Sequence, residues 1–482
     1  MKSESPVFFL NDVLTSTSGT MMSGLPETVF RGVSTDSRSI KKGNLFVALK
    51  GDHFDGHDYA ESVFQGGAAG ILAQDDEKIR RMKVDDTFAV IKVADTLFAL
   101  GEMAHDWRKK FSIPVIGLTG SSGKTTAKEM IASILGLKKN ILKTEGNLNN
   151  LIGLPQTIFR LTDQHDMMVL EMGTNTRGEI RRLTRIAEPD IGLITNVGPA
   201  HLEGFGSLQV VGEEKGDLFL NMPSSGIIVV NLDDEAILTA AETWKGRKIT
   251  FSMSPNADVT VFDIERNGAK GVRFNLAIRG NTQKVEMKIT GLHHINNAMA
   301  AAAVAVAAGM DLKNIAEGLS AFRPFHGRME IIKLRNGAYL LDDSYNANPA
   351  SVREALMTLK DLKGNHHAYV FLGDMLELGA QADEMHRKIG MLIATIGVKT
   401  LFLQGDYAGM TAAGATEGGM ASDSILFLSD KENGTDFLKK YLKKGDWIMV
   451  KGSRRMNMDR IAAQICEDFG RDKVSEENKT DY

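Results

Sequence analysis

A glycine-rich turn between an apolar run and a helical pattern constrains the fold of this chain more than any other stretch. The segment VIGLTGSSGKTTAKEM covers residues 115–130. A strand, a glycine-rich turn and a helix in this order direct several backbone N–H groups and the positive end of the helix dipole toward one anion. We therefore expect a phosphate-binding loop in which Lys124 reaches the terminal phosphates and the Thr125 hydroxyl binds magnesium.

The strict pattern of such a loop, GxxxxGK[ST], is not met. The window that ends at Thr125 begins with Leu118, and the glycines stand instead at 117, 120 and 123. An ordinary strand-to-helix turn is the alternative interpretation. A phosphate site is favoured over it because both the strand and the helix stand where the mechanism needs them.

Apolar runs of strand length alternate with helical patterns in two parts of the chain. From residue 113 onward the runs are IPVIGL, MMVLEM, DIGLIT and GIIVVN, and after about residue 323 they are AYVFLG, TLFLQG, ILFLS and DWIMVKG. This alternation predicts βαβ units and parallel sheets. Residues 258–290 instead alternate apolar and polar residues around Asn-Gly and Gly-Asn turns, which predicts an antiparallel insertion.

These patterns predict an α/β protein of three domains, because 482 residues exceed what one hydrophobic core supports. We expect a small α/β domain over 1–94, a central parallel-sheet domain with the phosphate loop over 95–322, and a doubly wound, Rossmann-like domain over 323–482. LFALGEMAHDWRKKF predicts a connecting helix at 97–111, and AMAAAAVAVAAGM predicts a closely packed helix at 298–310. The polar end of the chain, DKVSEENKTDY, is expected to fray.

Composition excludes several classes of function. Lys and Arg number 57 against 61 Asp and Glu, a formal charge of −4 without a basic block, so no nucleic acid is expected as the main ligand. The most apolar stretch falls short of the roughly 20 residues that span a bilayer, so no membrane insertion is expected. The single cysteine, Cys466, cannot form an internal disulfide, and the first residues do not resemble a signal peptide. Both observations indicate a reducing cytoplasm.

Three polar residues outside the loop are candidates for catalysis. Glu171 closes the run MMVLEM, and a carboxylate at the end of a neighbouring parallel strand can hold magnesium. His201 lies in a turn flanked by proline and glycine, and Lys215 follows on a predicted helix. Taken singly, the three are more simply explained as a solvated rim charge, a loop histidine and a solvated helix face. Their joint spacing favours a common site.

The same residues resemble the successive motifs of the Mur ligases, the ATP-dependent amide-forming enzymes of peptidoglycan precursor synthesis. The resemblance covers nearly the whole chain and rests on TGSSGKTT at 119–126, EMGTN at 171–175, the segment from His201 to Lys215, GLHHINNA at 291–298 and GRME at 327–330. STDSR at 34–38 resembles the uridine-diphosphate-binding domain of this family. DDSYNANPAS at 342–351 and LGDMLELG at 372–379 are similar to the branch that adds D-alanyl-D-alanine to UDP-N-acetylmuramoyl-tripeptide.

The resemblance implies which residues serve each ligand. ATP would be bound by Thr119, Gly120, Ser121, Ser122, Gly123, Lys124, Thr125, Thr126, Asn297, Arg328 and Asp343. Two Mg2+ ions would be held by Thr125, Glu171, His201 and Lys215, with Lys215 carbamoylated so that it presents a carboxylate. The sugar peptide would contact Ser34, Thr35, Asp36, Ser37, Arg38, Thr144, Asn149 and Asn150. Catalysis itself would depend on Lys124, Glu171, His201, Lys215 and Arg328.

Other interpretations stay open at this point. Within the superfamily, the chain could be the ligase that adds the third residue or a folylpolyglutamate synthetase, but DDSYNANP stands where those relatives resemble Asp-Tyr-Ala-His or Asp-Gly-Ala-His. From a different class, it could be a nucleotide-binding scaffold without ligase chemistry, or a P-loop kinase. Where the family pattern runs Gly-x-His-Asn, this chain has His294 after His293, and we expect His294 to be a merely buried or solvated side chain.

Overall fold

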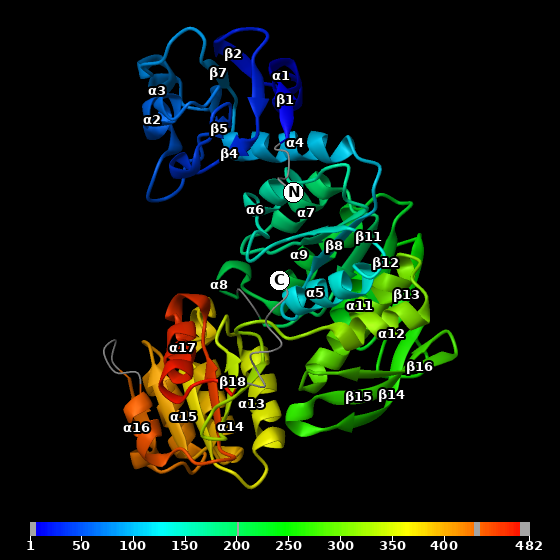
Figure 1. Ribbon diagram of the computed structural model, residues 1–482, viewed down its shortest axis with the longest axis vertical. Coiled ribbons are helices and arrows are strands. Elements are labelled where there is room, and N and C mark those ends of the chain that lie inside the picture. The colour runs from blue at the N-terminus through cyan, green and yellow to red at the C-terminus, as the bar shows by residue number, and fades with distance from the viewer. Residues whose placement is uncertain (1–5, 200–201, 429–433, 473–482) are drawn as a thin grey trace.

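The computed structural model describes residues 6–199, 202–428 and 434–472. They form three α/β domains that follow one another along the chain (Figure 1), which confirms the predicted fold class. The boundaries near residues 94 and 322 stay predictions. All but the first residue of the segment expected to fray lies outside the described residues. Within the described ranges, no helix combines the length and the apolar character that crossing a membrane requires.

The N-terminal domain is built around a five-stranded sheet of order β2-β7-β6-β5-β4. Strands β4 to β7 are parallel, β2 is an antiparallel edge, and β1 pairs separately with β3. The elements of this domain are β1 (Val7–Phe9), α1 (Leu10–Thr17), β2 (Thr20–Ser23), β3 (Val29–Arg31), β4 (Val33–Ser34), η1 (Ser37–Ser39), β5 (Leu45–Val47), η2 (Gly56–Tyr59), α2 (Ala60–Gln65), β6 (Gly70–Ala73), α3 (Asp76–Arg81) and β7 (Ala89–Lys92).

The predicted connecting helix is α4 (Thr96–Lys109), which lies between the first two domains (Figure 1). It begins at Asp95, whose side chain accepts a hydrogen bond from Phe98 N at 2.8 Å and so satisfies a free N–H of the first turn. Its apolar face packs against α1 on one side and against the helices of the central domain on the other. Trp107 Nε1 donates to Leu161 O at 3.2 Å. The helix therefore connects the two domains through side-chain packing on both of its sides.

The central domain contains a nine-stranded sheet of order β16-β15-β14-β13-β12-β11-β8-β10-β9. Strands β8 to β14 are parallel, whereas β15 is antiparallel to both of its neighbours, β14 and β16, which confirms the predicted insertion. The strands are β8 (Val115–Thr119), β9 (Ile141–Lys143), β10 (Met167–Glu171), β11 (Ile191–Ile194), β12 (Ile227–Asn231), β13 (Arg247–Phe251), β14 (Val259–Arg266), β15 (Val272–Ile278) and β16 (Asn281–Met287). The helices are α5 (Lys124–Leu135), α6 (Gly153–Ile158), α7 (Glu179–Ala187), α8 (Leu202–Phe205), α9 (Leu208–Asn221), α10 (Glu235–Ala241), η3 (Gly268–Lys270), α11 (Leu292–Ala307) and α12 (Leu312–Ala321).

The strand order places the phosphate loop at a switch point of this sheet. Strand β8 lies between β10 and β11, so the connections on its two sides run in opposite directions along the sheet. In open α/β sheets, ligands bind in the crevice outside the carboxyl ends of the strands at such a point. The loop at residues 119–124 leaves β8 there and leads directly into α5.

The alanine-rich helix α11 is almost entirely buried, as its composition predicts. Residues 300–303 are at most 1% exposed, and the helix packs against α5 and against strands of the sheet. Alanine allows this close approach because it occupies little space and favours the helix. Leucine at Ala301 is therefore expected to overpack the core and to lower the free energy of unfolding by about 1–3 kcal/mol.

Chemical denaturation of the Ala301→Leu protein tests this expectation. The matched control is Glu317→Leu on α12, where the side chain is exposed. That change should alter the free energy of unfolding by less than about 0.5 kcal/mol. Equal unfolding midpoints for the two variants would contradict the packing argument.

The C-terminal domain has a six-stranded sheet of order β17-β18-β22-β19-β20-β21. All pairs are parallel except β17 with β18, an antiparallel pair that the sequence patterns did not predict. The elements are β17 (Glu330–Lys333), β18 (Tyr339–Asp343), α13 (Pro349–Lys363), β19 (Ala368–Gly373), η4 (Gly379–Gln381), α14 (Ala382–Thr395), β20 (Thr400–Gln404), α15 (Ala408–Glu417), η5 (Ser422–Ser424), β21 (Ile425–Phe427), α16 (Thr435–Tyr441), β22 (Trp447–Lys451), η6 (Arg454–Met456) and α17 (Met458–Phe469).

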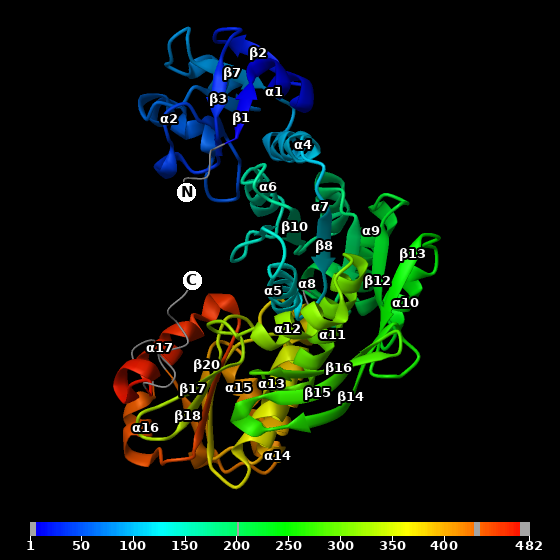
Figure 2. The same cartoon turned by 45° about the vertical axis from the view of Figure 1, so that its right-hand side comes forward.

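The C-terminal domain lies beside the central domain, on the side away from the N-terminal domain (Figure 2). Contacts between the two domains are both apolar and polar: Met385 of α14 packs against Phe205 and Val211 of the central domain. Asn348 Nδ2 donates to Ser121 O at 3.5 Å, and Glu203 N donates to Glu377 O at 3.2 Å. The hydrogen bond of Asn348 brings the start of α13 to the phosphate loop.

Candidate active site

The glycines of the phosphate loop are required by its conformation. Gly123 has a φ of 76°, and a Cβ there would lie 2.3 Å from Asn297 Oδ1. Gly120 has a φ of 152°, and a Cβ there would lie 1.9 Å from Thr195 Oγ1. A residue with a side chain would therefore be strained at both positions and would collide with neighbouring side chains. The loop is therefore a tight glycine turn, although its sequence departs from the strict pattern GxxxxGK[ST].

The loop is held by the end of the neighbouring strand β11. Ser122 N donates to Asn196 Oδ1 at 3.0 Å, Ser121 N donates to Asn196 O at 3.0 Å, and Thr195 Oγ1 donates to Ser122 O at 2.7 Å. Neither Thr195 nor Asn196 was predicted as a site residue, although the polar pair that closes DIGLITN could have indicated it. These bonds fix the loop before any ligand binds.

Lys124 begins α5, and its Nζ donates to Gly120 O across the loop at 2.7 Å. Burial lowers the pKa of Lys124, while the nearby Glu171 carboxylate raises it and the Arg328 guanidinium lowers it further. The ammonium thus lies inside the loop between an acidic and a basic side chain. This position allows it to contact the oxygen atoms of a bound phosphate.

Glu171 ends β10 with only 2% of its surface exposed, so its interpretation as a solvated rim charge is wrong. Its Oε1 accepts hydrogen bonds from Asn149 Nδ2 at 2.9 Å and from Thr125 Oγ1 at 3.3 Å. Its Oε2 is buried and accepts no hydrogen bond from the described residues. A buried carboxylate oxygen next to a threonine hydroxyl suits a hard divalent cation, so these two residues fit Mg2+.

Lys215 lies on α9 with 2% of its surface exposed, which shows that the interpretation as a solvated helix face is wrong. Burial and the charge of Lys124 lower the pKa of Lys215 to about 7, while Glu214 opposes the shift. In about half of the molecules, Lys215 would therefore carry an uncharged amine at neutral pH. His201, its predicted companion, lies outside the described residues.

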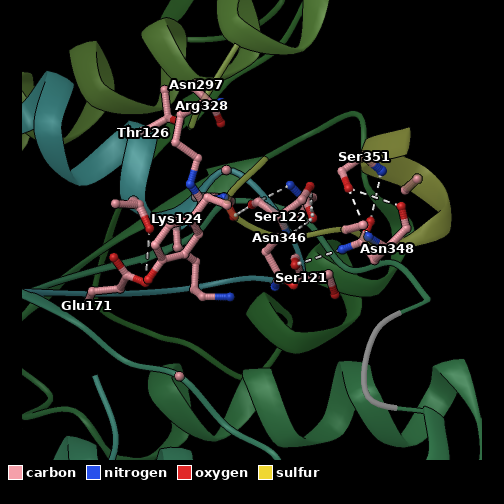
Figure 3. A pocket seen from close by; sticks show the side chains of 18 of the residues that line it. Ser121, Ser122, Lys124, Thr126, Glu171, Asn297, Arg328, Asn346, Asn348 and Ser351 are labelled. Atoms are coloured by element: carbon pink, nitrogen blue, oxygen red, sulfur yellow. Dashed lines mark hydrogen bonds between the residues drawn. The ribbon is translucent and has the colours of Figure 1, made fainter. Parts of the chain in front are cut away.

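The far wall of the site comes from α11 and from the start of the C-terminal domain (Figure 3). Asn297 points at the loop from α11, and the Arg328 guanidinium carbon lies 4.2 Å from the centre of the Tyr345 ring. Asp343 Oδ1 accepts from Met329 N at 3.2 Å, and Asp343 Oδ2 pairs with the buried ammonium of Lys451. The Arg328 Nε is buried and donates no hydrogen bond to the described residues, so this arginine can still bind an anion.

These side chains surround one cavity of about 480 Å3 (Figure 3). Thr119 and Gly120 lie below its surface, and Lys215 does not line it. Lining residues without a predicted role include Tyr345 to Asn348 of the motif DDSYNANP, and others come from the segments at 146–147, 173–175 and 195–196. The predicted residues that line it are Ser121, Ser122, Gly123, Lys124, Thr125, Thr126, Asn149, Asn150, Glu171, Asn297, Arg328 and Asp343.

His293 and His294 also line the cavity, with ring centres 4.1 Å apart. His294 is buried, as expected. Burial lowers the pKa of His293 to about 4 and that of His294 well below its ordinary value. Both rings are therefore neutral at physiological pH, and they offer hydrogen-bonding groups without adding charge to the site.

The residues predicted for the sugar peptide fall into two places. Asn149 and Asn150 line the cavity, whereas none of the five residues at 34–38 does. Thr144 is fully buried, and its Oγ1 accepts from Glu171 N at 3.0 Å, so it supports Glu171 and does not face the cavity. The two domains meet where Gln156 Nε2 donates to Thr35 Oγ1 at 2.8 Å.

Inside the 34–38 segment, Asp36 and Arg38 form a two-pronged ion pair. Arg38 Nε and Nη2 donate to the two Asp36 oxygens at 2.9 and 2.8 Å. The side-chain hydrogen bonds from Arg38 lower the pKa of Asp36 to about 2. The segment follows β4 and forms an ordered, charged turn that is open to solvent.

Three family models match consecutive parts of the chain. The Mur ligase family catalytic-domain model matches residues 29–108, the Mur ligase middle-domain model matches 118–305, and the Mur ligase glutamate-ligase-domain model matches 327–454. Together they cover all three domains of the structure.

Curated relatives and solved structures match over nearly the whole length. The UDP-N-acetylmuramoyl-tripeptide-D-alanyl-D-alanine ligase of Escherichia coli is 37% identical over 90% of this chain and 93% of its own, and that of Bacillus subtilis is 34% identical over 92% and 94%. A crystal structure of MurF from Acinetobacter baumannii superimposes with a TM-score of 0.87 at 30% identity, covering 96% of this chain and 100% of its own. The MurF ligase of Thermotoga maritima in complex with ADP gives 0.80 at 26% identity, covering 91% and 97%.

Proposed function

This chain belongs to the Mur ligase family, and from that premise we propose that it joins D-alanyl-D-alanine to UDP-N-acetylmuramoyl-tripeptide, with ATP converted to ADP and phosphate. The observation that carries the proposal is the identity of 31–37% to eight curated ligases of this one specificity over about nine tenths of the chain. DDSYNANP and LGDMLELG support the same branch over its sister ligases. A reducing cytoplasm stays the proposed compartment.

The chemistry requires activation of a carboxylate. A carboxylate is too poor an electrophile for an amine to attack, so the terminal carboxylate of the tripeptide first takes the γ-phosphoryl group of ATP. The neutral amine of the dipeptide then attacks the acyl phosphate, and the tetrahedral intermediate collapses to an amide and phosphate. Both steps depend on positioning and on the neutralisation of negative oxygens.

The cavity supplies groups for each part of this reaction. Lys124 and Arg328 approach the same space from opposite walls and would stabilise the transferred phosphoryl group. Asn297 and Asp343 would contact the nucleotide, and the neutral pair His293 and His294 lies beside them. Asn149 and Asn150 would contact the peptide end of the acceptor, while the turn at 34–38 would bind its uridine diphosphate end.

Magnesium fits the residues that the structure brings together at the end of β10. Thr125 and Glu171 would hold it, with His201 and Lys215 as further ligands. Mg2+ bound there would supply positive charge that neutralises the phosphate oxygens during transfer. The observation that supports this assignment is Glu171 Oε2, which accepts no hydrogen bond from the described residues and lies 3.9 Å from Lys128 Nζ.

Carbamoylation of Lys215 is favoured by its surroundings. Carbon dioxide reacts with an uncharged amine, and the lowered pKa of Lys215 leaves a large uncharged fraction near pH 7. The product is a carboxylate, which removes the repulsion between Lys215 and Lys124. It also turns a buried cation into a group that can ligate magnesium.

Phosphate release tests the proposed function. We expect release from ATP with UDP-N-acetylmuramoyl-tripeptide only when D-alanyl-D-alanine is added, and a product heavier by one dipeptide less water. D-alanine alone is the matched control for the acceptor amine. Release with a single amino acid instead would assign the chain to a sister ligase. Binding of ATP without release under any pairing would indicate a nucleotide-binding scaffold.

A further inference from the structure

Three side chains that commonly bind metals meet outside the cavity of Lys124. His326 lies in the linker between α12 and β17, Glu330 begins β17, and Asp342 lies on β18. One donor atom of each lies within 4.8 Å of the donor atoms of the other two. None of the three lines the cavity described above. The cluster is therefore separate from the proposed magnesium site.

The two carboxylates of this cluster face each other across the unpredicted strand pair. Glu330 and Asp342 are direct partners in the antiparallel register of β17 and β18. Like charges in this position repel each other and destabilise a sheet. The Asp342 side chain is fully buried, so water does not screen the repulsion. Positive charge relieves this repulsion, and Arg471 Nη1 supplies part of it on the outer side of Glu330, 3.5 Å from Oε1.

The two distances from His326 match those between ligands of a tetrahedral ion, and the two carboxylate oxygens lie within 4.8 Å of each other. His326 Nδ1 lies 3.3 Å from Asp342 Oδ2 and 3.5 Å from Glu330 Oε2. Ligands of a tetrahedral ion with bonds of about 2.0–2.1 Å lie about 3.3–3.4 Å from one another.

Protonation of His326 explains the cluster less well. A charge-assisted hydrogen bond would be about 2.7–2.9 Å long, which is shorter than either distance from His326 Nδ1 to the two carboxylates. Asp342 Oδ2 is buried, points at His326 and accepts no hydrogen bond from the described residues. A cation that contacts all three donor atoms satisfies this oxygen, which lies 3.3 Å from His326 Nδ1 without accepting a hydrogen bond from it.

Outer contacts orient the carboxylates as in a metal site. Asp342 Oδ1 accepts from Ser344 N at 3.1 Å and from Ser344 Oγ at 2.6 Å, which leaves Oδ2 directed at the cluster. Arg471 Nη1 lies 3.5 Å from Glu330 Oε1. The His326 side chain is 57% exposed, so an ion can enter from solvent and keep a water molecule as its fourth ligand.

We propose that His326, Glu330 and Asp342 bind one divalent transition-metal ion of the Zn2+ type, a class that an imidazole ligand favours over Mg2+. The ion fastens the linker to the β17–β18 pair. Arg328 lies two residues after His326, and Asp343 follows Asp342 in the chain. Metal binding would therefore stabilise the segment that presents Arg328 and Asp343 to the nucleotide cavity.

Zinc titration of the full-length, tag-free chain tests the proposal. The titration is run by competition with a chromophoric chelator, in saturating Mg2+ and ADP to occupy the nucleotide site. We expect one Zn2+ per chain, and an affinity at least about 100-fold lower for His326→Ala, because it loses a direct ligand. His326 is exposed, so this change should not unfold the protein, and His53→Ala, an exposed histidine of the N-terminal domain, is the matched control. Equal zinc binding by His326→Ala and wild type, or no zinc binding by wild type, would overturn the proposal.

Cobalt provides a second, spectroscopic test. In His326→Cys, Co2+ is expected to give a thiolate charge-transfer band that the wild type lacks, since its single cysteine, Cys466, is not part of the cluster. Adding Glu330→Gln to His326→Cys should weaken cobalt binding and reduce the band. A His326→Cys protein without the band, or a band that Glu330→Gln leaves unchanged at limiting cobalt, would show that these residues do not share an ion.

Discussion

Replacement of Lys215 by alanine is expected to lower the rate of ligation by about 100- to 1,000-fold, the scale observed when one group that stabilises the transition state is removed. High acetate or formate should restore part of the activity, because either anion can take the place of the carbamate carboxylate. Steady-state phosphate release with and without the additive measures both effects. The reason is local, since Lys215 is buried close enough to Lys124 for the two charges to repel each other.

The lowered pKa adds a pH dependence to this prediction. With a pKa of about 7, the uncharged fraction of Lys215 rises from roughly one tenth at pH 6 to roughly nine tenths at pH 8. Carbamoylation should rise with it, and 13C NMR with labelled bicarbonate should show a carbamate signal that Lys215→Ala lacks. Lys245→Ala, at an exposed lysine of the same domain, is the matched control. Full activity of Lys215→Ala without any additive would refute the role of the carbamate.

Replacement of Lys124 by alanine is expected to reduce the turnover of ATP by about 100- to 1,000-fold as well, with no rescue by acetate. The ammonium lies inside the phosphate loop and is the cation nearest to where the phosphates would bind. Its loss should slow phosphoryl transfer more than it weakens nucleotide binding, since the backbone N–H groups of the loop remain. Rapid-quench measurement of ADP formation separates the two effects.

The control for this variant is Lys139→Ala, at an exposed lysine just beyond α5. It should leave ADP formation unchanged. If Lys124→Ala formed ADP at the wild-type rate, the loop would not act as a phosphate-transfer site. Rescue of Lys124→Ala by acetate would also count against the assignment, because an anion cannot replace an ammonium group.

Local sequence patterns predicted those parts of the fold that depend on periodicity. The apolar runs became β8, β10, β11 and β12, and the alternating segment became the antiparallel strands β14 to β16. The pair β17 and β18 was not predicted, because its strands are short and carry charged residues such as Glu330 and Asp342. Their pairing becomes visible only when the strands are aligned in space.

The sequence predicted the part of the site that one local motif forms. It predicted less well the surroundings of residues where several segments meet. The loop at 119–126 could be recognised from glycine, lysine and threonine alone. The burial of Glu171 and Lys215 could not, because exposure depends on neighbours such as Asn149 and Lys124 that come from other segments. For the same reason Thr144 was assigned to the substrate, although its hydroxyl lies beneath Glu171.

The packing of helix α4 between the first two domains fixes the distance between the turn at 34–38 and the cavity of Lys124. If the turn at 34–38 binds one end of the acceptor and the cavity of Lys124 binds the other, the gap between them is set by the packing of α4 between α1 and the helices α6 and α7, and by the contact between Gln156 and Thr35. A peptide one residue too short would leave its carboxylate away from the γ-phosphate. One residue too many would force it past that point. Selection of the acceptor would then rest on spacing between domains as well as on side-chain recognition.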